Sequence, residues 1–166
     1  ERPGLTVAKL FWWYNMYSTA DISATPRPHY LVDGRKIPGI YTRPAGLEKE
    51  LESALGRFPL FNFWGPAADI RSSRWIVDAA LHVLERRAPD LAFVYLPHLD
   101  YDLQRFGPDS PEALRAVAEL DAEASRLIDA ARGRDYASRE EVAQRLMHND
   151  SRLSPAFAAY LQEVEA

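Results

Sequence analysis

Apolar residues follow two spacings along the chain, and each spacing predicts a different kind of element. Residues 5–14 are rich in β-branched and aromatic side chains without helical spacing, which predicts a buried strand. Residues 91–96 form a short, continuously apolar run and give the clearest strand in the sequence. Residues 58–66 are aromatic-rich and close on Gly65 and Pro66, so we expect a strand or a tightly packed extended segment there.

Apolar residues three and four positions apart predict helices between these segments. The first carries Leu47, Leu51 and Leu55 and stops at Gly56; the second is capped by Ser72 or Ser73 and buries Ile76, Ala79, Ala80, Val83 and Leu84; the third begins at Ser110, Pro111 and Glu112 and ends at Gly133. Strands that are apolar on both faces, alternating with helices, predict an α/β fold in which a parallel sheet is flanked by helices.

Two segments lack this regular alternation. Residues 15–46 have no helical spacing and contain four prolines, which indicates an irregular cover over a site, a small hairpin or a plain surface excursion. Residues 134–166 hold two further helical patterns, one capped by Ser138 with Glu141 and one beginning at Ser154. We therefore divide the chain into an α/β domain, residues 1–133, and a helical tail of the same compact unit.

Composition narrows the function. A formal net charge of −4 and a pI near 5.6 argue against nucleic acid as a partner. Without cysteine, any metal must be held by His, Asp or Glu. No apolar run reaches the roughly 20 residues of a membrane span, so we expect a soluble, cytoplasmic protein. The chain starts with Glu1 and not Met, so a leader lost before this point stays an open alternative.

Candidate chemistry follows the strand at residues 91–96. His98, Asp100 and Asp102 alternate along the chain, and in an extended segment all three side chains would point to one side. Such a trio at the carboxyl end of a parallel strand predicts a metal or catalytic site. The alternative is that one or two of these residues only shape a turn. The sequence has no Gly-x-Ser-x-Gly motif and no phosphate-cradling glycine loop.

Several motifs in the same order resemble a known family. They are "LFWWYNMYSTADISATPRPHY", "DGRKIPGIYTRPAGL", "FPLFNFWGP", "IRSSRWI" and "VYLPHLDYDLQRFGP". Together they resemble the bacterial branch of the type I phosphodiesterase / nucleotide pyrophosphatase family, in the alkaline phosphatase superfamily, over about residues 5–133. The resemblance implies an α/β/α sandwich enzyme that hydrolyses phosphate mono- or diesters with two metal ions, commonly zinc, and a Thr or Ser nucleophile.

The resemblance also implies roles for residues near the strand end. The family motif Asp-x-x-x-His-x-x-Gly-Pro places its metal-binding Asp at Asp100 and its His at Gln104. An amide oxygen is a weaker zinc ligand than imidazole, so this site would bind zinc less tightly, use His98 or Asp102 instead, or take another metal or none. If they do not bind the metal, His98 and Asp102 are candidates to orient the metal ligands through hydrogen bonds.

The resemblance places other parts of the family's site outside these residues. The nucleophile would precede Leu5, and further Asp and His ligands would follow Arg132. The sequence therefore predicts a partial or degenerate domain that is inactive alone and has either an oligomeric partner or a missing remainder. The alternative is a non-catalytic ligand-binding or protein-interaction module whose groove uses exposed aromatic residues: Trp12, Trp13, Tyr17 and Phe63. Aromatic residues more often belong to the core, and we expect that of most of these four.

Basic residues in the cover segment are candidates for substrate binding. Arg27, His29, Tyr30, Arg35 and Lys36 could contact an anionic group, although a solvated basic patch explains the same composition. The expected substrate is a small phosphorylated molecule, either a nucleotide or a sugar or lipid head-group phosphate, and the sequence does not choose between them.

Overall fold

The structure is a computed structural model that describes residues 5–12 and 15–134. Its strands are β1 (Val7–Leu10), β2 (Ile22–Pro26), β3 (His29–Tyr30), β4 (Lys36–Ile37), β5 (Ile40–Arg43) and β6 (Leu91–Val94). Its helices are α1 (Leu47–Leu55), the short 3-10 helix η1 (Leu60–Asn62), α2 (Ile70–Arg87), α3 (His98–Phe106) and α4 (Pro111–Arg132). No helix in this described part is long and apolar enough to cross a bilayer.

The chain divides into two units, Glu1–Ile128 and Asp129–Ala166. All the elements except the end of α4 belong to the first unit. The two tail helices predicted after Ser138 and Ser154 lie outside the described residues, so the predicted boundary at residue 133 stays a prediction.

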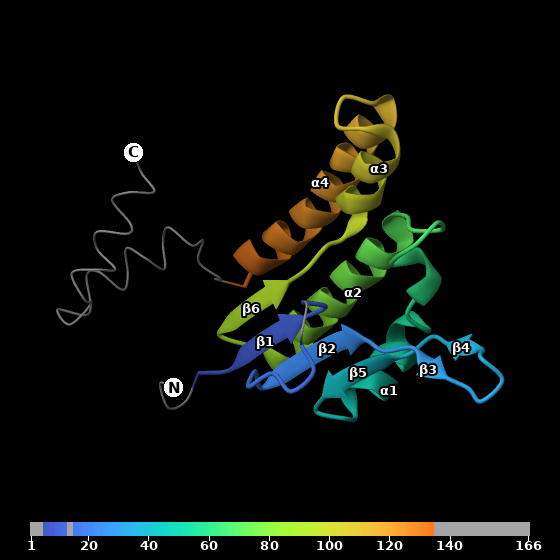
Figure 1. Cartoon of the computed structure of the whole chain (residues 1–166). Helices are drawn as coiled ribbons and strands as arrows, with labels where there is room; N and C mark the ends of the chain where they lie inside the picture. The colour runs from blue at the N-terminus through green and yellow to red at the C-terminus, as the bar shows by residue number, and fades with distance from the viewer. Residues whose placement is uncertain (1–4, 13–14, 135–166) are drawn as a thin grey trace, which may run out of the picture. The chain divides into compact units, whose positions relative to one another are not determined.

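A four-stranded, mostly parallel sheet organises the first unit (Figure 1). Its strand order is β5-β2-β1-β6, with β1 parallel to both β2 and β6 and only β5 antiparallel to its neighbour. The predicted α/β fold with a parallel sheet flanked by helices is confirmed. The first strand is shorter than the predicted residues 5–14.

The predicted irregular cover contains a long hairpin. β2 and β5 belong to the main sheet, and the chain between them adds the small pair β3–β4 at the tip. Gly34 turns the tip with φ +82°, and the Arg35 N–H donates to Asp33 Oδ1 at 3.0 Å. The small-hairpin alternative is therefore confirmed. The wholly irregular reading is wrong, because β2 is buried between two neighbouring strands.

The hydrophobic core lies on one face of the sheet, against α1 and α2. Phe11, Phe58 and Trp75 pack together there, with ring centroids 4.9 Å apart for the tilted pair Phe11–Phe58 and 5.2 Å for the edge-to-face pair Phe58–Trp75. Residues 58–66 form η1 and turns and no strand, which corrects the prediction. Phe63 is also buried in this cluster, whereas Phe61 and Trp64 of the same segment are exposed.

Helix α2 begins earlier than predicted. Asp69 is its N-cap and accepts a hydrogen bond from the Arg71 N–H at 2.9 Å. Ser72 and Ser73, the predicted caps, are instead buried in its first turn. α1 and α4 match their predictions closely. Gly56 ends α1, and Ser110 Oγ accepts from the Ala113 N–H at 3.1 Å at the start of α4.

The other face of the sheet is open around β6. Leu91 and Phe93 of this strand are exposed, while Ala92 and Val94 turn toward the core. The prediction that this strand is buried on both faces is wrong, because β6 is an outer strand among the described elements and only its alternate residues, Ala92 and Val94, pack against the core.

Candidate functional site

Helix α3 replaces the extended loop expected after β6. Its start at His98 follows Pro97, and Gly107, with φ +86°, ends it. Side chains in a helix repeat every 3.6 residues, so alternate positions do not share a face. His98, Asp100 and Asp102 therefore do not converge, and the expectation of three ligands pointing one way is wrong.

The candidate ligands lie on two different faces of α3. His98 and Asp102 lie one turn apart on the inner face, where His98 Nε2 is 2.8 Å from Glu119 Oε2 of α4. Asp102 Oδ1 pairs with Arg105 Nη1 at 3.4 Å. Asp100 and Gln104, also one turn apart, are exposed, and no side-chain hydrogen bond involves either of them within the described residues.

These residues do not complete a metal site by themselves. The described part of the chain contains no group of three or more His, Cys, Asp or Glu side chains placed to hold an ion. Asp100 and Gln104 offer two oxygen donors, whereas zinc is usually held by three or four protein ligands. The ligand roles of Asp100 and Gln104 and the supporting roles of His98 and Asp102 stay predictions.

Arg105 fastens α3 to the loop that precedes α2. Its guanidinium donates to the carbonyls of Gly65 at 2.8 Å, Pro66 at 3.0 Å and Ala68 at 3.3 Å. The planar fork of arginine suits several carbonyls presented by one turn. The loop is thereby held in one conformation, with Trp64 immediately before it.

Asp69, at the end of the same loop, is a charged anchor. Burial raises the pKa of its carboxyl, but hydrogen bonds from the Arg71 side chain and backbone outweigh this, and the pKa lies below its ordinary value. Nearby His98 lowers it further when protonated. Asn62 Nδ2 also donates to Asp69 Oδ2 at 3.1 Å. Asp69 is therefore a carboxylate at neutral pH, and its contacts are structural.

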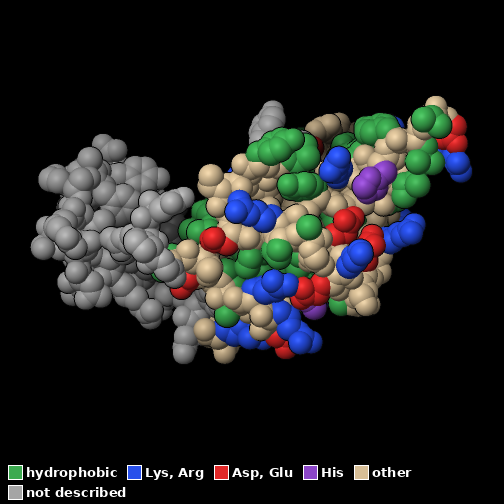
Figure 2. Space-filling view, turned by 90° about the horizontal axis from the view of Figure 1, so that it is seen from below, with side chains coloured by type: hydrophobic (Ala, Val, Ile, Leu, Met, Phe, Trp, Pro, Cys, Tyr) green, Lys and Arg blue, Asp and Glu red, His purple; other side chains and the backbone are tan. Residues whose placement is uncertain are grey.

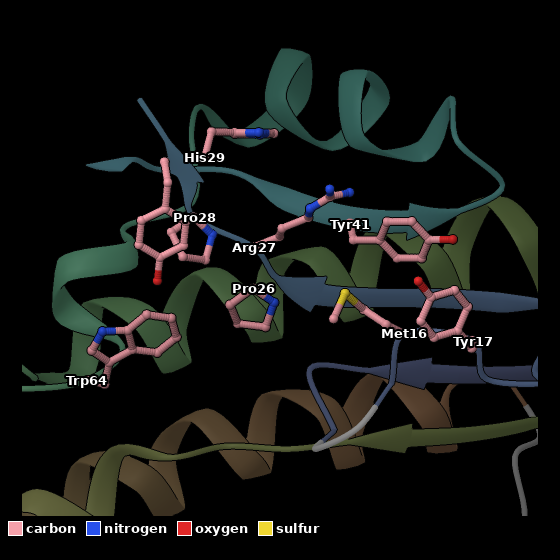
Figure 3. A pocket seen from close by; sticks show the side chains of 9 residues that line it. Met16, Tyr17, Pro26, Arg27, Pro28, His29, Tyr41 and Trp64 are labelled. Carbon is pink, nitrogen blue, oxygen red and sulfur yellow. The ribbon is translucent and has the colours of Figure 1, made fainter. Parts of the chain in front are cut away.

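A pocket of about 710 Å³ opens near the carboxyl ends of β1 and β2. It is lined by Met16, Tyr17, Pro26, Arg27, Pro28, His29, Tyr30, Tyr41 and Trp64. Figure 3 shows Tyr17, Tyr41 and Met16 at one end, Trp64 at the other, and Arg27 between them. Because α3 follows the carboxyl end of parallel β6, the pocket and the candidate ligands belong to the same edge of the sheet, where α/β folds bind ligands.

Arg27 gives this pocket its positive charge. Its guanidinium carbon lies 5.9 Å from the centre of the Tyr41 ring, a cation–π distance, and no acidic side chain lines the pocket. No ion pair engages Arg27 in the described residues, so its N–H groups are available to an anion.

Tyr17 is held out over the pocket by an unusual backbone. It has φ +64°, in the left-handed region that tyrosine rarely adopts, and its side chain is almost entirely exposed, at 94%. Such a conformation costs on the order of 1 kcal/mol, and it recurs at ligand sites. Of the other aromatic candidates, Trp12 is exposed and Trp13 lies outside the described residues. Phe63 belongs to the core, as expected of most of these aromatic residues, whereas Trp12 and Tyr17 do not.

The structure groups only some of the predicted basic residues. Arg27, His29 and Tyr30 line the pocket, and Lys36 lines a smaller one of about 380 Å³ with Trp64 between the two. Arg35 instead pairs with Asp33, Nε to Oδ2, at 2.7 Å. Sequence reasoning missed Met16, Tyr41 and Trp64. The aromatic segment around Trp64 was the available signal, but it was assigned to packing.

A close contact at Gly39 fixes His29 beside the pocket. A Cβ added at Gly39 would lie 2.4 Å from His29 Nε2 and 3.1 Å from the Arg27 carbonyl oxygen. We expect Gly39→Ala to push the imidazole away and to cost about 1 kcal/mol of stability through the tight backbone contact. The imidazole resonances in a two-dimensional NMR spectrum would measure the displacement.

Gly46→Ala is the matched control for this substitution. Nothing lies within 4 Å of a Cβ there, and its φ of −70° suits alanine. We expect the His29 resonances to be the same in Gly46→Ala as in the unsubstituted protein. If they were also the same in Gly39→Ala, the close approach would be contradicted.

The surface charge is mixed. The face drawn in Figure 2 carries Lys and Arg side chains next to Asp and Glu, with hydrophobic groups between them. Among the residues that line the pocket, Arg27 is the one lysine or arginine, so the positive charge of the pocket comes from a single guanidinium.

Comparison with known proteins identified a matching family. The family model described as Type I phosphodiesterase / nucleotide pyrophosphatase matches residues 1–142. No curated protein and no solved structure matched the chain. The matched stretch includes both the pocket and α3.

Proposed function

The chain belongs to the type I phosphodiesterase / nucleotide pyrophosphatase family, and from this membership we propose that it is the substrate-binding part of a phosphate-ester hydrolase. The family match is the observation that carries the proposal. The family is generally metal-dependent. In our proposal the chain contributes Asp100 as a metal ligand with Gln104 beside it, and His98 and Asp102 orient these ligands or replace them.

The pocket supports a role in binding the organic half of the substrate. Tyr17, Tyr41 and Trp64 offer flat apolar surfaces, and the Arg27 guanidinium offers hydrogen bonds to an anion. Since it belongs to the same sheet edge as α3, one molecule that bears a phosphate could meet both. We propose a nucleotide or a sugar or lipid head-group phosphate as the substrate class.

A second candidate function is a non-catalytic binding module derived from the same fold. It is favoured by Gln104 at the position of the family's histidine and by the lack of a three-ligand group in the described residues. A module of this kind would bind its ligand without metal. The hydrolase would need a divalent ion, zinc in our proposal, together with ligands beyond those described.

Substitution of Arg27 tests the pocket. We expect Arg27→Ala to weaken binding of adenosine monophosphate, glucose 1-phosphate or phosphocholine about tenfold, because a charged hydrogen bond contributes about 1.5 kcal/mol or more. Titration calorimetry on all three probes would measure this and would rank the substrate classes. Arg35→Ala is the matched control, since Arg35 lies in the same hairpin but pairs with Asp33. Equal losses in both variants would contradict the pocket assignment.

Metal dependence separates the two functions. Binding of a probe that survives treatment with a chelator favours the module, and binding that returns only with added zinc or manganese favours the hydrolase. Turnover of bis(4-nitrophenyl) phosphate by the 166-residue chain alone would contradict the proposal that further residues are needed for catalysis.

A further inference from the structure

The connection between β1 and β2 is short for a pair of parallel strands. Such strands are usually joined by a crossover of a dozen or more residues that contains a helix. Here the connection is residues 11–21, and those of them that the structure describes form turns and bends but no helix. The Phe11 N–H donates to the Ala24 carbonyl at 2.7 Å, so the chain stays bonded to β2 as it leaves β1. Beyond that point, side-chain contacts hold the connection in place.

Asn15 supplies these contacts. The residue is only 1% exposed, and its Nδ2 donates to the Lys9 carbonyl of β1 at 2.6 Å and to the Ala24 carbonyl of β2 at 2.9 Å. Both neighbours are acceptors, so only the amide nitrogen can face them. The Asn15 Oδ1 is buried without a hydrogen-bond partner in the described part of the chain. The contribution of asparagine at this position is therefore its two N–H groups, which tie two neighbouring strands together.

The backbone of Asn15 begins the turn that carries Tyr17. The Ser18 N–H donates to the Asn15 carbonyl at 3.2 Å, which closes a four-residue β-turn. Tyr17 is the third residue of this turn and has φ +64°, and a positive φ at that position favours glycine or asparagine. Met16 and Tyr17 both line the pocket, at the end where Tyr41 lies (Figure 3). The turn therefore holds a large ring at the pocket in a place where glycine would be less strained.

We propose that Asn15 is a positioning residue of the pocket and that it acts through Tyr17, which determines specificity for the organic group of the ligand. This inference rests on the function proposed for the pocket. Asn15 is buried and is not among the residues that line the pocket, so it acts by fixing the turn, and the turn fixes the Tyr17 ring. Arg27 is held separately, because its N–H donates to the Gly39 carbonyl at 2.9 Å. The contact with phosphate is therefore independent of Asn15.

Tyr17→Gly tests the role of the ring. We expect it to melt at about the same temperature as the unsubstituted protein, because the relief of strain offsets the greater freedom of glycine in the unfolded chain. Its affinity for the tightest-binding of adenosine monophosphate, glucose 1-phosphate and phosphocholine should fall about fivefold, since the contact with the ring is lost. Its affinity for inorganic phosphate should not change. Titration calorimetry measures both affinities.

Asn15→Ser tests the positioning. A single hydroxyl cannot donate to both carbonyls, so we expect the turn to loosen and the Ser18 amide to exchange with solvent about tenfold faster. The affinity for the same phosphate ester should fall as it does in Tyr17→Gly, and the affinity for inorganic phosphate should stay unchanged. In the double variant the loss should equal that of Tyr17→Gly alone, because Asn15 acts through that ring. Should Asn15→Ser fail to fold, Asn15→Asp takes its place, since it keeps the shape of the side chain without the N–H groups.

Glu123→Ala is the control for a loss of stability without a loss of positioning. It breaks the contact of Glu123 Oε1 with Arg74 Nε, at 2.9 Å, and neither residue lines the pocket. We expect this variant to melt at a lower temperature and to bind both the phosphate ester and inorganic phosphate as the unsubstituted protein does. A merely structural role of Asn15 would give the same pattern.

Three results would overturn the role of Asn15. One is an equal loss of affinity for the ester and for inorganic phosphate in Asn15→Ser. Another is a greater loss in the double variant than in Tyr17→Gly, because Asn15 would then act through other groups. The third is unchanged exchange of the Ser18 amide. If the unsubstituted protein bound neither inorganic phosphate nor any of the three esters, the function proposed for the pocket would fail, and this inference with it. In every other outcome the pocket binds its ligand, and the variants decide the role of Asn15 alone.

Discussion

Replacing Glu123 by alanine is expected to lower the free energy of unfolding by about 2 to 3 kcal/mol. The Glu123 side chain is only 7% exposed and joins α4 to α2. Its Oε1 accepts from Arg74 Nε at 2.9 Å, and its Oε2 accepts from Arg126 Nη1 at 2.5 Å. Arg126 also reaches Asp78 of α2 at 2.6 Å, so one buried carboxylate organises the contact between the two helices.

The expected loss stays moderate because the arginines can return to water. Arg74 and Arg126 are each about half exposed, so removing Glu123 strands no buried cation. For a chain of this size the loss corresponds to a melting temperature lower by about 5 to 10 °C. Circular dichroism during heating would measure it. Asp121→Ala, an exposed acid on the same helix, should change the melting temperature little.

The pH dependence of the free energy of unfolding tests the contacts that ionised Glu123 makes with Arg74 and Arg126. Burial raises the pKa of Glu123, but hydrogen bonds from Arg74 and Arg126 outweigh burial and hold the pKa below the ordinary value of 4.5. A lowered folded pKa stabilises the protein fully above about pH 4.5, and this contribution is lost as the pH falls through the folded value. The free energy of unfolding of the unsubstituted protein should exceed that of Glu123→Gln at neutral pH, and this difference should shrink below pH 4.5. A constant difference down to pH 3 would contradict the ionic contact.

Helices with caps and regular apolar spacing could be predicted from the sequence. α3 is the exception, because an extended loop was expected in its place. α1 and α4 combine an apolar stripe with a stop or start signal, Gly56 and Ser110. α3 has such signals too, since Leu99, Leu103 and Phe106 keep helical spacing up to Gly107. The alternating polar residues His98, Asp100 and Asp102 favour an extended loop, whereas this apolar period favours the helix that the structure has.

The hairpin and the pocket depend on contacts that no local pattern contains. β2 is a strand because β1 and β5 flank it, although its sequence includes Ser23 and ends at Pro26. The pocket unites Tyr17, Arg27 and Trp64 from three separate segments. Arg27 could be named from its charge alone. Its pairing with Tyr41, by contrast, depends on the path of the hairpin.

Replacing Arg105 by methionine is expected to loosen the loop between η1 and α2 and to cost about 2 kcal/mol of stability. Methionine keeps much of the apolar stem but loses the guanidinium that bonds Gly65, Pro66 and Ala68. The carbonyls would then have to find water. Arg105→Lys keeps the charge but not the fork, so we expect it to recover only part of the loss.

Hydrogen exchange read by mass spectrometry localises this effect. The Ala68 N–H donates to the Gly65 carbonyl and the Asp69 N–H to the Asn62 carbonyl, each at 3.1 Å. We expect both amides to exchange faster in Arg105→Met, with β1 unchanged. Arg71→Met is the local control, because Arg71 pairs with Asp69 at the helix start and touches none of the three carbonyls. It should leave exchange at Ala68 unchanged.

Loss of Arg105 should also reach the pocket, because Trp64 directly precedes the loop that the guanidinium holds. A freed loop lets the indole leave the pocket wall, so binding of a phosphorylated probe should weaken in Arg105→Met while Arg27 stays in place. Weaker binding together with faster exchange at Ala68 would establish that α3 positions the pocket. Faster exchange at Ala68 with unchanged binding would mean that Arg105 stabilises the loop but does not affect the pocket. Unchanged exchange at Ala68 would contradict the proposal that Arg105 anchors the loop.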